Sequence, residues 1–405
     1  MKRAVYRMKR VSPFDLNSKG WSKGFEVQPL KHLLRQYFMF QASRSDLLVR
    51  LAQSPSFQSV VSKFLYGVYT GGETFESSTR LINEMCTRNT RTILDESIEE
   101  VHDQEKLDKN LSNKLSLLEK LNDQCPEVIF MPIKCTSLIH PQALEALTSL
   151  LDKARFDSWD HVADIPQQLS LSDRKLYEEG YSRLYALCEH VRDKSARLSL
   201  LLDAEQSPRQ LAVEFIHIQL ATQFNKLPSL VTMSKSKRLQ MEREEQVLFS
   251  PVVYTTVQSY LTRSHTALQK TLAHCTKHGL VLGVKLVRGA YLQYEIQHSK
   301  ERNIECAVHV SKETTDHSYQ QNSQLLLDHL ANFYNQKGVC NSLHVIYATH
   351  DRQSIEYVVR RIQEHLYALE FFSDWRKAKS HRMLSDHIHF AQILGRSAMY
   401  SATAS

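Results

Sequence analysis

The sequence is poor in glycine and lacks several patterns that would each point to a particular class of protein. Only 11 of its 405 residues are glycine, and no GxGxxG follows an early strand, which disfavours a doubly wound dinucleotide-binding sheet. No run of about 18 apolar residues occurs, so we expect no membrane-spanning helix. The seven cysteines form no CxxC pair and have no histidine at zinc spacing, so we expect no metal site and buried thiols in a reducing compartment.

Acidic residues are scarce at the N-terminus, and this scarcity locates the net charge. Residues 1–40 contain nine Lys or Arg but only two acids, and they account for the whole net charge of +7. The remaining neutral body disfavours nucleic acid as a partner, since nucleic-acid binders carry a basic excess on the folded domain. The acid-free opening is typical of a mitochondrial targeting leader, although an ordinary solvated tail fits it equally well. We therefore expect residues 1–30 to be a basic leader or a disordered arm.

The rest of the chain shows two kinds of periodicity. Residues 31–90 have apolar positions at helical spacing and predict a helical arm. After residue 90, short β-branched runs alternate with helical patterns, which predicts βαβ units and a parallel sheet. The predicted strands are 92–94, 128–133, 198–202, 247–253, 280–287, 344–348 and 387–390. Two polar segments, 234–246 and 296–322, are predicted to be surface excursions.

Polar side chains follow the predicted strands. They are Asp95, Lys134, Asp203, Gln258, Arg288, His350 and Gln392. A (β/α)8 TIM-type barrel carries its chemistry just past the C-terminal ends of its strands, so this pattern favours the barrel among α/β folds. We expect residues 91–405 to form a distorted, incomplete barrel that lacks its last strand and helix. Seven strands can be counted, and only 15 residues remain after Phe390.

The segment 283–291 carries the sharpest chemical signal. Its apolar strand places Lys285 and Val287 on one face, because side chains alternate along a strand. The strand then breaks at Gly289, where a backbone without a Cβ can approach a ligand. Two cations, Lys285 and Arg288, suit a phosphate or an anionic heterocycle. An ordinary barrel strand with a lysine that reaches solvent fits these residue types equally well.

Six segments resemble, in the same order, the motifs of proline dehydrogenases of the fungal mitochondrial type. They are 133–138, 202–205, 256–261, 285–291 (KLVRGAY), 348–350 and 392–395. The resemblance covers roughly residues 30–399. It implies a distorted barrel that holds FAD and oxidises L-proline to Δ1-pyrroline-5-carboxylate, the first step of proline catabolism, by hydride transfer from C5 to flavin N5. It also implies a membrane quinone as electron acceptor and peripheral association with the matrix face of the mitochondrial inner membrane.

The resemblance also implies residue roles. Lys285 would lie beside flavin N5, where a cation stabilises the negative charge of the reduced ring, and Asp203 would line the proline pocket. Lys134 would pair with the proline carboxylate, and Tyr291 would lie beside the substrate. The implied cofactor contacts are Ala204, Gln258, Val287, Arg288, Gly289, Ala290, Thr349 and His350. From residue type alone, a solvated lysine at 134 and a helix N-cap at 203 are the commoner roles.

The chain departs from the family pattern after Gly395. The family continues with a gating tyrosine, an eighth strand and a final helix with R-R-x-x-E-N, whose arginines clamp the substrate carboxylate. The last ten residues, 396–405, do not resemble that continuation, so we expect a chain truncated at the C-terminus. Two further hypotheses stay open for this reason: an inactive or non-catalytic paralogue with the same scaffold, and a hydroxyproline dehydrogenase.

Overall fold

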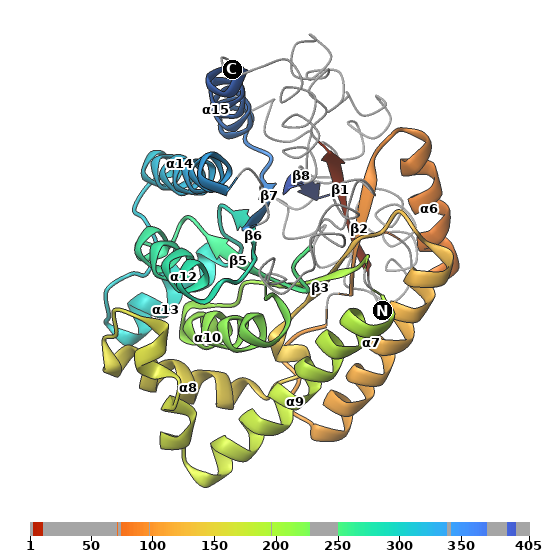
Figure 1. Ribbon diagram of the computed structural model, residues 1–405. Coiled ribbons are helices and arrows are strands. Elements are labelled where there is room, and N and C mark those ends of the chain that lie inside the picture. The colour runs from red at the N-terminus through yellow and green to blue at the C-terminus, as the bar shows by residue number, and fades with distance from the viewer. Residues whose placement is uncertain are drawn as a thin grey trace, which may run out of the picture.

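The structure is a computed structural model in which the described residues form one curled sheet surrounded by helices (Figure 1). The described residues are 3–10, 71, 74–96, 98–195, 197–226, 250–337, 342–370 and 387–393. Most of the predicted helical arm, the polar segment 234–246 and the tail 394–405 therefore lie outside the described residues.

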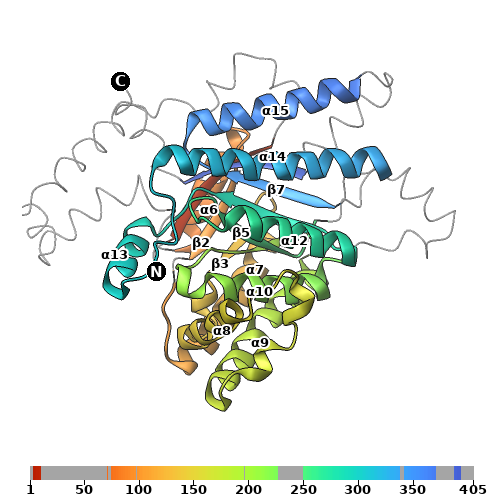
Figure 2. The same ribbon diagram turned by 90° about the vertical axis from the view of Figure 1, so that its left-hand side faces the viewer.

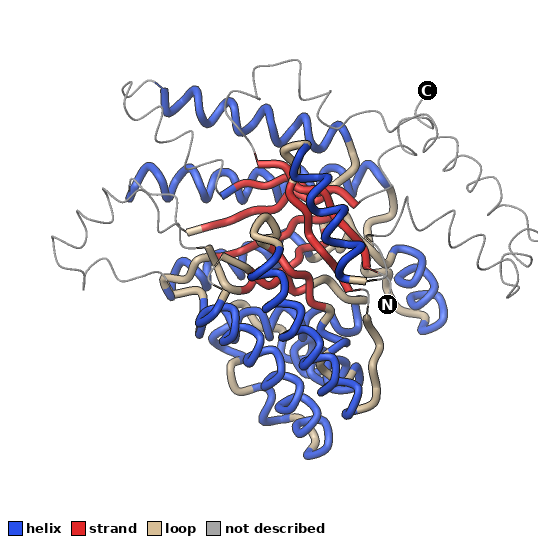
Figure 3. Tube along the Cα trace, turned by 90° about the vertical axis from the view of Figure 1, so that its right-hand side faces the viewer, coloured by secondary structure: helices blue, strands red, loops and turns tan. Residues whose placement is uncertain are grey.

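The described strands form one eight-stranded sheet in the order β2-β1-β8-β7-β6-β5-β4-β3. They are β1 (Arg3–Arg10), β2 (Arg91–Glu96), β3 (Phe130–Ile133), β4 (Ser199–Leu202), β5 (Val253–Gln258), β6 (Leu282–Val287), β7 (Leu343–Ala348) and β8 (Ile388–Ile393). From β3 to β8, each strand pairs in parallel with the next along the chain, as βαβ units require. The two ends of the sheet, β2 and β3, contact each other, so the sheet curls into a barrel (Figure 3).

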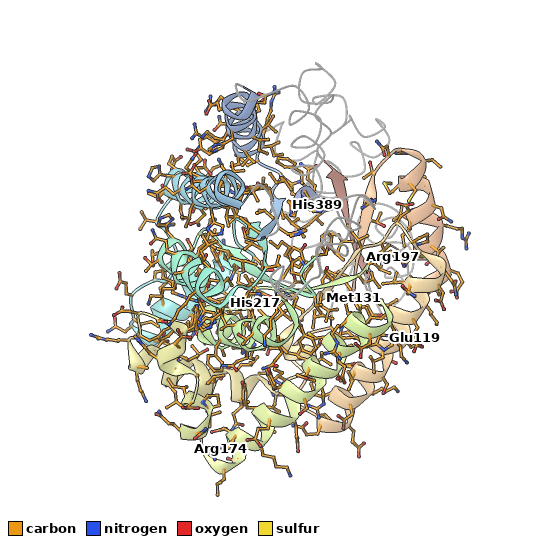
Figure 4. All side chains as sticks on the ribbon, in the orientation of Figure 1. Glu119, Met131, Arg174, Arg197, His217 and His389 are labelled. Carbon is orange, nitrogen blue, oxygen red and sulfur yellow. The ribbon has the colours of Figure 1, made fainter. Side chains whose placement is uncertain are left out.

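Helices cover the outer face of the sheet. They are α6 (Phe75–Thr87), α7 (Gln104–Gln124), α8 (Pro141–Ala154), α9 (Leu171–Lys194), α10 (Ser207–Phe224), α12 (Ser264–His278), α13 (Leu292–Arg302), α14 (Lys312–Lys337) and α15 (Arg352–Glu370). Figure 2 shows α12, α14 and α15 lying along the strands, with α13 beyond one end of them. Figure 4 shows Glu119 on the outside and Met131 and His217 between the layers. None of the described helices combines the length and the apolarity needed to cross a bilayer.

The inside of the barrel is filled by alternate strand residues. An interior cluster consists of Ile93, Phe130, Leu201, Tyr254, Ile346 and Ala391. Gly283 belongs to this layer, because a Cβ there would lie 2.5–2.7 Å from ring atoms of Tyr254. The barrel is therefore packed at mid-height, and ligand chemistry is confined to its ends.

One predicted strand is wrong in its position. The fourth predicted strand, 247–253, lies too early, because β5 begins at Val253. The Asn225 side chain fixes this start by donating to the Val253 carbonyl oxygen (2.8 Å) and accepting from its N–H (3.1 Å). The polar segment 296–322, which was predicted to be a surface excursion, contains the end of α13 and the beginning of α14, and α14 packs against β6 and β7.

The eighth strand comes from the N-terminus, where the sequence predicts a basic leader or a disordered arm. β1 runs antiparallel between β2 and β8, with Tyr6 opposite Ile93 on one side and Ile393 on the other (Figure 1). It thereby pairs the open edges of both neighbours, which would otherwise leave backbone groups unpaired. The predicted domain boundaries at residues 30 and 90 stay predictions.

Candidate active site

A layer of polar side chains lies directly above the interior cluster, at the C-terminal ends of the parallel strands. The strand register places Lys285 of β6 beside Thr256 of β5. It also places the ends of β3 and β4 side by side, which brings Lys134 next to Asp203. The structure therefore brings together, at one end of the barrel, residues that lie far apart in the sequence. We call this end the barrel mouth.

A buried ion pair occupies the centre of the barrel mouth. The Lys285 ammonium donates to Oδ1 of Asp203, and the two residues are only 8% and 4% exposed. Asp95, at the end of β2, lies close enough that burial, followed by the charge of Asp203, raises the pKa of its carboxyl to about 7. Such a carboxyl can exchange a proton near neutral pH, which is typical of functional sites.

A second cation, Lys134, lies at the rim of the barrel mouth. Its Nζ donates to the Tyr291 hydroxyl (2.7 Å) and lies 3.6 Å from the half-exposed carboxylate of Glu99. Burial disfavours the charged lysine, but Asp203 and Tyr291 outweigh burial and raise the pKa of Lys134. Burial also raises the pKa of Tyr291 to about 12, against the effect of Lys134. At neutral pH the rim therefore presents an ammonium group and a neutral phenol.

Gln258 ties the ends of β4 and β6 together. Its amide nitrogen donates to the Glu205 carbonyl oxygen (3.0 Å), and its amide oxygen accepts from the Ala290 N–H (3.1 Å). Ala204 is buried beside this link. The Glu205 carboxylate accepts hydrogen bonds from the backbone N–H and the hydroxyl of Thr136 (3.3 and 3.0 Å), and burial raises its pKa to about 7.

Gly289 has a packing role within the chain. A Cβ at this position would lie 2.4–2.5 Å from ring atoms of Tyr260, so only glycine lets this aromatic ring pack against the backbone here. Arg288 is also engaged within the chain. Its guanidinium donates to Asp316 of α14 and to the Ser354 hydroxyl of α15 (3.4 Å).

Thr349 and His350 form a second group with Arg288, at the ends of β6 and β7. The Thr349 hydroxyl accepts from the Asp351 N–H (3.0 Å), and Nε2 of His350 accepts from the Ile393 N–H (3.1 Å). Half-buried Val287 connects this group to the ion pair, because it occupies the next inward position of β6 after Lys285. The roles implied for these residues stay predictions.

Sequence reasoning gave no role to three residues that the structure places at the barrel mouth. Asp95 was predicted only as a polar residue at a strand end. Its raised pKa is caused first by burial and then by the charge of Asp203, and neither can be read from the sequence. Glu205 and Tyr260 lie inside recognised segments, and their positions beside Asp203 and Gln258 were the available signals. Their importance follows from burial, which the spacing of residues does not reveal.

A sequence model of the family "Proline dehydrogenase" matches residues 79–372. The hydroxyproline dehydrogenase of Rattus norvegicus is 28% identical over 245 residues, which cover 58% of this chain and 48% of that protein. Proline dehydrogenase 1, mitochondrial, of Dictyostelium discoideum is 24% identical over 345 residues, which cover 79% and 54%. The chain thus spans about half the length of these two curated relatives.

Solved structures share the fold. The proline utilization A protein of Bdellovibrio bacteriovorus, inactivated by N-propargylglycine, aligns with a TM-score of 0.54 at 14% identity and covers 87% of this chain and 32% of its own. A Bradyrhizobium japonicum proline utilization A variant aligns with a TM-score of 0.52 at 19% identity and covers 88% and 32%. The proline dehydrogenases among the relatives are oxidoreductases. Because the family model matches well over half of the residues, this chain belongs to the proline dehydrogenase family of oxidoreductases.

Proposed function

We propose that the chain binds FAD at the barrel mouth and oxidises L-proline to Δ1-pyrroline-5-carboxylate. In this reaction the C5–H bond breaks, a C5=N bond forms and the amine N–H proton is released. Bound FAD supplies the acceptor for the hydride, and so for both electrons, at N5. The observation that carries the proposal is the buried Lys285–Asp203 pair, with a second cation at the rim.

The donors of the barrel mouth fit a flavin. The reduced isoalloxazine is anionic, and Lys285 is a cation held in a nearly dry environment, where it interacts strongly with nearby charge. The pyrophosphate is also anionic, and Arg288 lies at the end of the same strand, followed by Thr349 and His350 on the neighbouring one. Arg288 would share its guanidinium between Asp316 and the cofactor.

Lys134 would bind the proline carboxylate. Its ammonium is charged, partly exposed and already 3.6 Å from one carboxylate, that of Glu99. A substrate carboxylate could take the place of Glu99, which is half-exposed and gains little from the pair. Charge-assisted hydrogen bonds of this kind contribute about 1.5–3 kcal/mol each.

Two buried carboxyl groups, Asp203 and Asp95, would orient the substrate amine and accept its proton. Hydride leaves C5 readily only when the ring nitrogen is uncharged, so the substrate must lose a proton on or before binding. Asp203 lies where it could accept a hydrogen bond from the ring N–H, and Asp95, with its pKa raised to about 7, could hold the proton. Burial keeps bulk water away from both carboxyl groups.

A second substrate deserves a direct comparison, because hydroxyproline dehydrogenases are prominent among the relatives. The Rattus norvegicus and Mus musculus proteins of that name are 28% and 24% identical to this chain over their matched regions. Trans-4-hydroxy-L-proline carries the same ring and carboxylate, so Lys134 would bind both substrates.

The test is anaerobic reduction of the FAD-loaded chain. We expect L-proline to bleach the flavin band, with hydroxyproline as the parallel substrate. Lys134→Met should raise the required proline concentration about 10- to 100-fold without loss of FAD. The matched control is Lys153→Met, which removes an exposed lysine of α8. Bound FAD that neither substrate reduces would contradict the proposal and favour the non-catalytic alternative.

The proposal also covers the acceptor that reoxidises the flavin and the compartment in which the protein acts. We infer that a membrane quinone reoxidises the flavin at the matrix face of the mitochondrial inner membrane. The relatives from Arabidopsis thaliana and Dictyostelium discoideum are named mitochondrial, which supports the compartment. A water-soluble ubiquinone analogue should restore the flavin band after proline reduction, and failure to do so would exclude quinone as the acceptor.

A further inference from the structure

A cluster of metal-ligating side chains lies on the outside of the barrel, away from the mouth. His274 and His278 are four residues apart on α12, so they project from the same face of the helix. Asp160 reaches them from the short 3-10 turn 159–162, in the connection between α8 and α9. Because α12 runs back from the end of β5, its last turns lie near the N-terminal ends of the strands.

The geometry of this cluster is close to that of a metal site. Nε2 of His278 lies 2.8 Å and Nδ1 of His274 lies 3.4 Å from Oδ1 of Asp160. One possible ligand atom from each residue lies within 4.8 Å of the others. Ligand atoms in a tetrahedral zinc site are separated by about 3.3–3.5 Å. Small side-chain rotations would therefore bring all three ligands to bonding distance.

Ion pairs with Asp160 do not account for the burial of the His274 imidazole. Lys277 donates to Oδ2 of Asp160 (2.7 Å), and His278 contacts Oδ1, so the carboxylate is well satisfied. The His274 side chain, in contrast, is only 7% exposed, and its Nδ1 lies 3.4 Å from Asp160 Oδ1 without forming a hydrogen bond; neither ring nitrogen is hydrogen-bonded among the described residues. Burying a polar group without a hydrogen bond is costly, and a bound cation would remove that cost.

The surrounding contacts already hold the ligands in place. The Trp159 indole N–H donates to the Thr271 hydroxyl (3.4 Å), and the Lys270 ammonium donates to the Phe156 carbonyl oxygen. These bonds dock the connection onto α12 next to Asp160. Little conformational freedom would be lost on binding, because the ligand-bearing segments are already fixed.

We propose that Asp160, His274 and His278 bind a divalent transition-metal ion of the zinc type, with water completing the coordination. Two imidazole nitrogens and one carboxylate oxygen suit Zn²⁺, whereas Ca²⁺ and Mg²⁺ prefer oxygen ligands throughout. Lys277, on the other carboxylate oxygen, would orient Asp160 for the metal. The site is structural: it ties the α8–α9 connection to α12 and is separate from the proposed oxidation at the mouth.

The experiment measures Zn²⁺ binding by the full chain after treatment with a chelator. Asp160→Asn and His278→Ala remove a ligand, and His161→Ala removes an exposed histidine next to Asp160 as the matched control. We expect the wild type and His161→Ala to bind one more Zn²⁺ per chain than the ligand variants, whose affinity at this site should fall by about 100-fold or more. Zinc bound by other histidines is common to the wild type and all variants, so it cancels in the difference between them.

Two readouts distinguish a structural metal site from an ion-pair cluster that binds no metal. Co²⁺ in the site should give visible ligand-field absorption that both ligand variants lose. Zn²⁺ should raise the melting temperature of the wild type and the control but not of the ligand variants. Equal zinc stoichiometry and affinity in the wild type and His278→Ala, with folding intact in chelator, would overturn the proposal and leave an ion-pair cluster.

Discussion

The barrel mouth and the cluster around Asp160 contain similar chemical groups in different surroundings. The side chains of Lys285 and Asp203 are 10% and 6% exposed, whereas those of Lys277 and Asp160 are 67% and 30% exposed. Water screens the outer pair, so it contributes little to folding, about 0–1 kcal/mol. At the barrel mouth, burial first and the charge of Asp203 second raise the pKa of Asp95 to about 7, although the nearby charge of Lys285 opposes the shift. The burial of a charged cluster, more than its composition, therefore suits it to redox chemistry.

Breaking the buried pair should have the largest effect. Lys285→Met leaves the Asp203 carboxylate buried without its cation, so we expect a loss of about 3–5 kcal/mol in the free energy of unfolding. Urea denaturation measures this loss. The double variant Lys285→Met/Asp203→Asn removes both charges and should recover much of the stability. A single variant that loses less than about 1 kcal/mol would mean that the pair is not dry.

Replacing Asp95, the carboxyl whose pKa is raised, should change how the free energy of unfolding depends on pH. Asp95 has a folded pKa of about 7 against an ordinary value of 3.8, so ionisation favours the unfolded state as pH rises through this window. Asp95→Asn has no such penalty, and its gain over the wild type should be about 1–3 kcal/mol larger at pH 8 than at pH 5. Exposed Asp157→Asn is the control. Parallel pH profiles for the wild type and Asp95→Asn would contradict the assignment.

Substitution in the cluster around Asp160 should change the free energy of unfolding least. With chelator present, Lys277→Ala removes a screened ion pair and should cost less than about 1 kcal/mol in the free energy of unfolding. That small cost should disappear in 1 M NaCl, where the Debye length is about 3 Å. A salt-independent loss of several kcal/mol would place this cluster in the same energetic class as the barrel mouth and remove the contrast between them.

Sequence patterns predicted the parallel part of the barrel and the residues at its mouth. Alternation along β6 placed Lys285 and Val287 on one face, and the strand ends placed Asp203 and Lys134 at the same edge. Neighbouring strands in a βαβ fold are consecutive in the chain, so these local patterns were sufficient.

Other features depend on contacts between distant segments, which spacing does not encode. Nothing in residues 3–10 identifies the partners of β1, because its pairing depends on the open edges of β2 and β8. Gly289 is required by the ring of Tyr260, and Asp160 meets its histidines more than 100 residues further along the chain. Cysteine spacing, on which the expectation of no metal was based, carries no information about such a site.

The two-electron midpoint potential of the FAD-loaded chain tests the proposed role of Lys285 most directly. In the proposed function Lys285 lies beside the flavin ring, where a cation stabilises the reduced, anionic form, so Lys285→Met should shift the potential to more negative values by about 30 mV or more, equivalent to about 1.4 kcal/mol. Equal potentials in the wild type and the variant, or a wild-type chain that binds no FAD, would contradict the account.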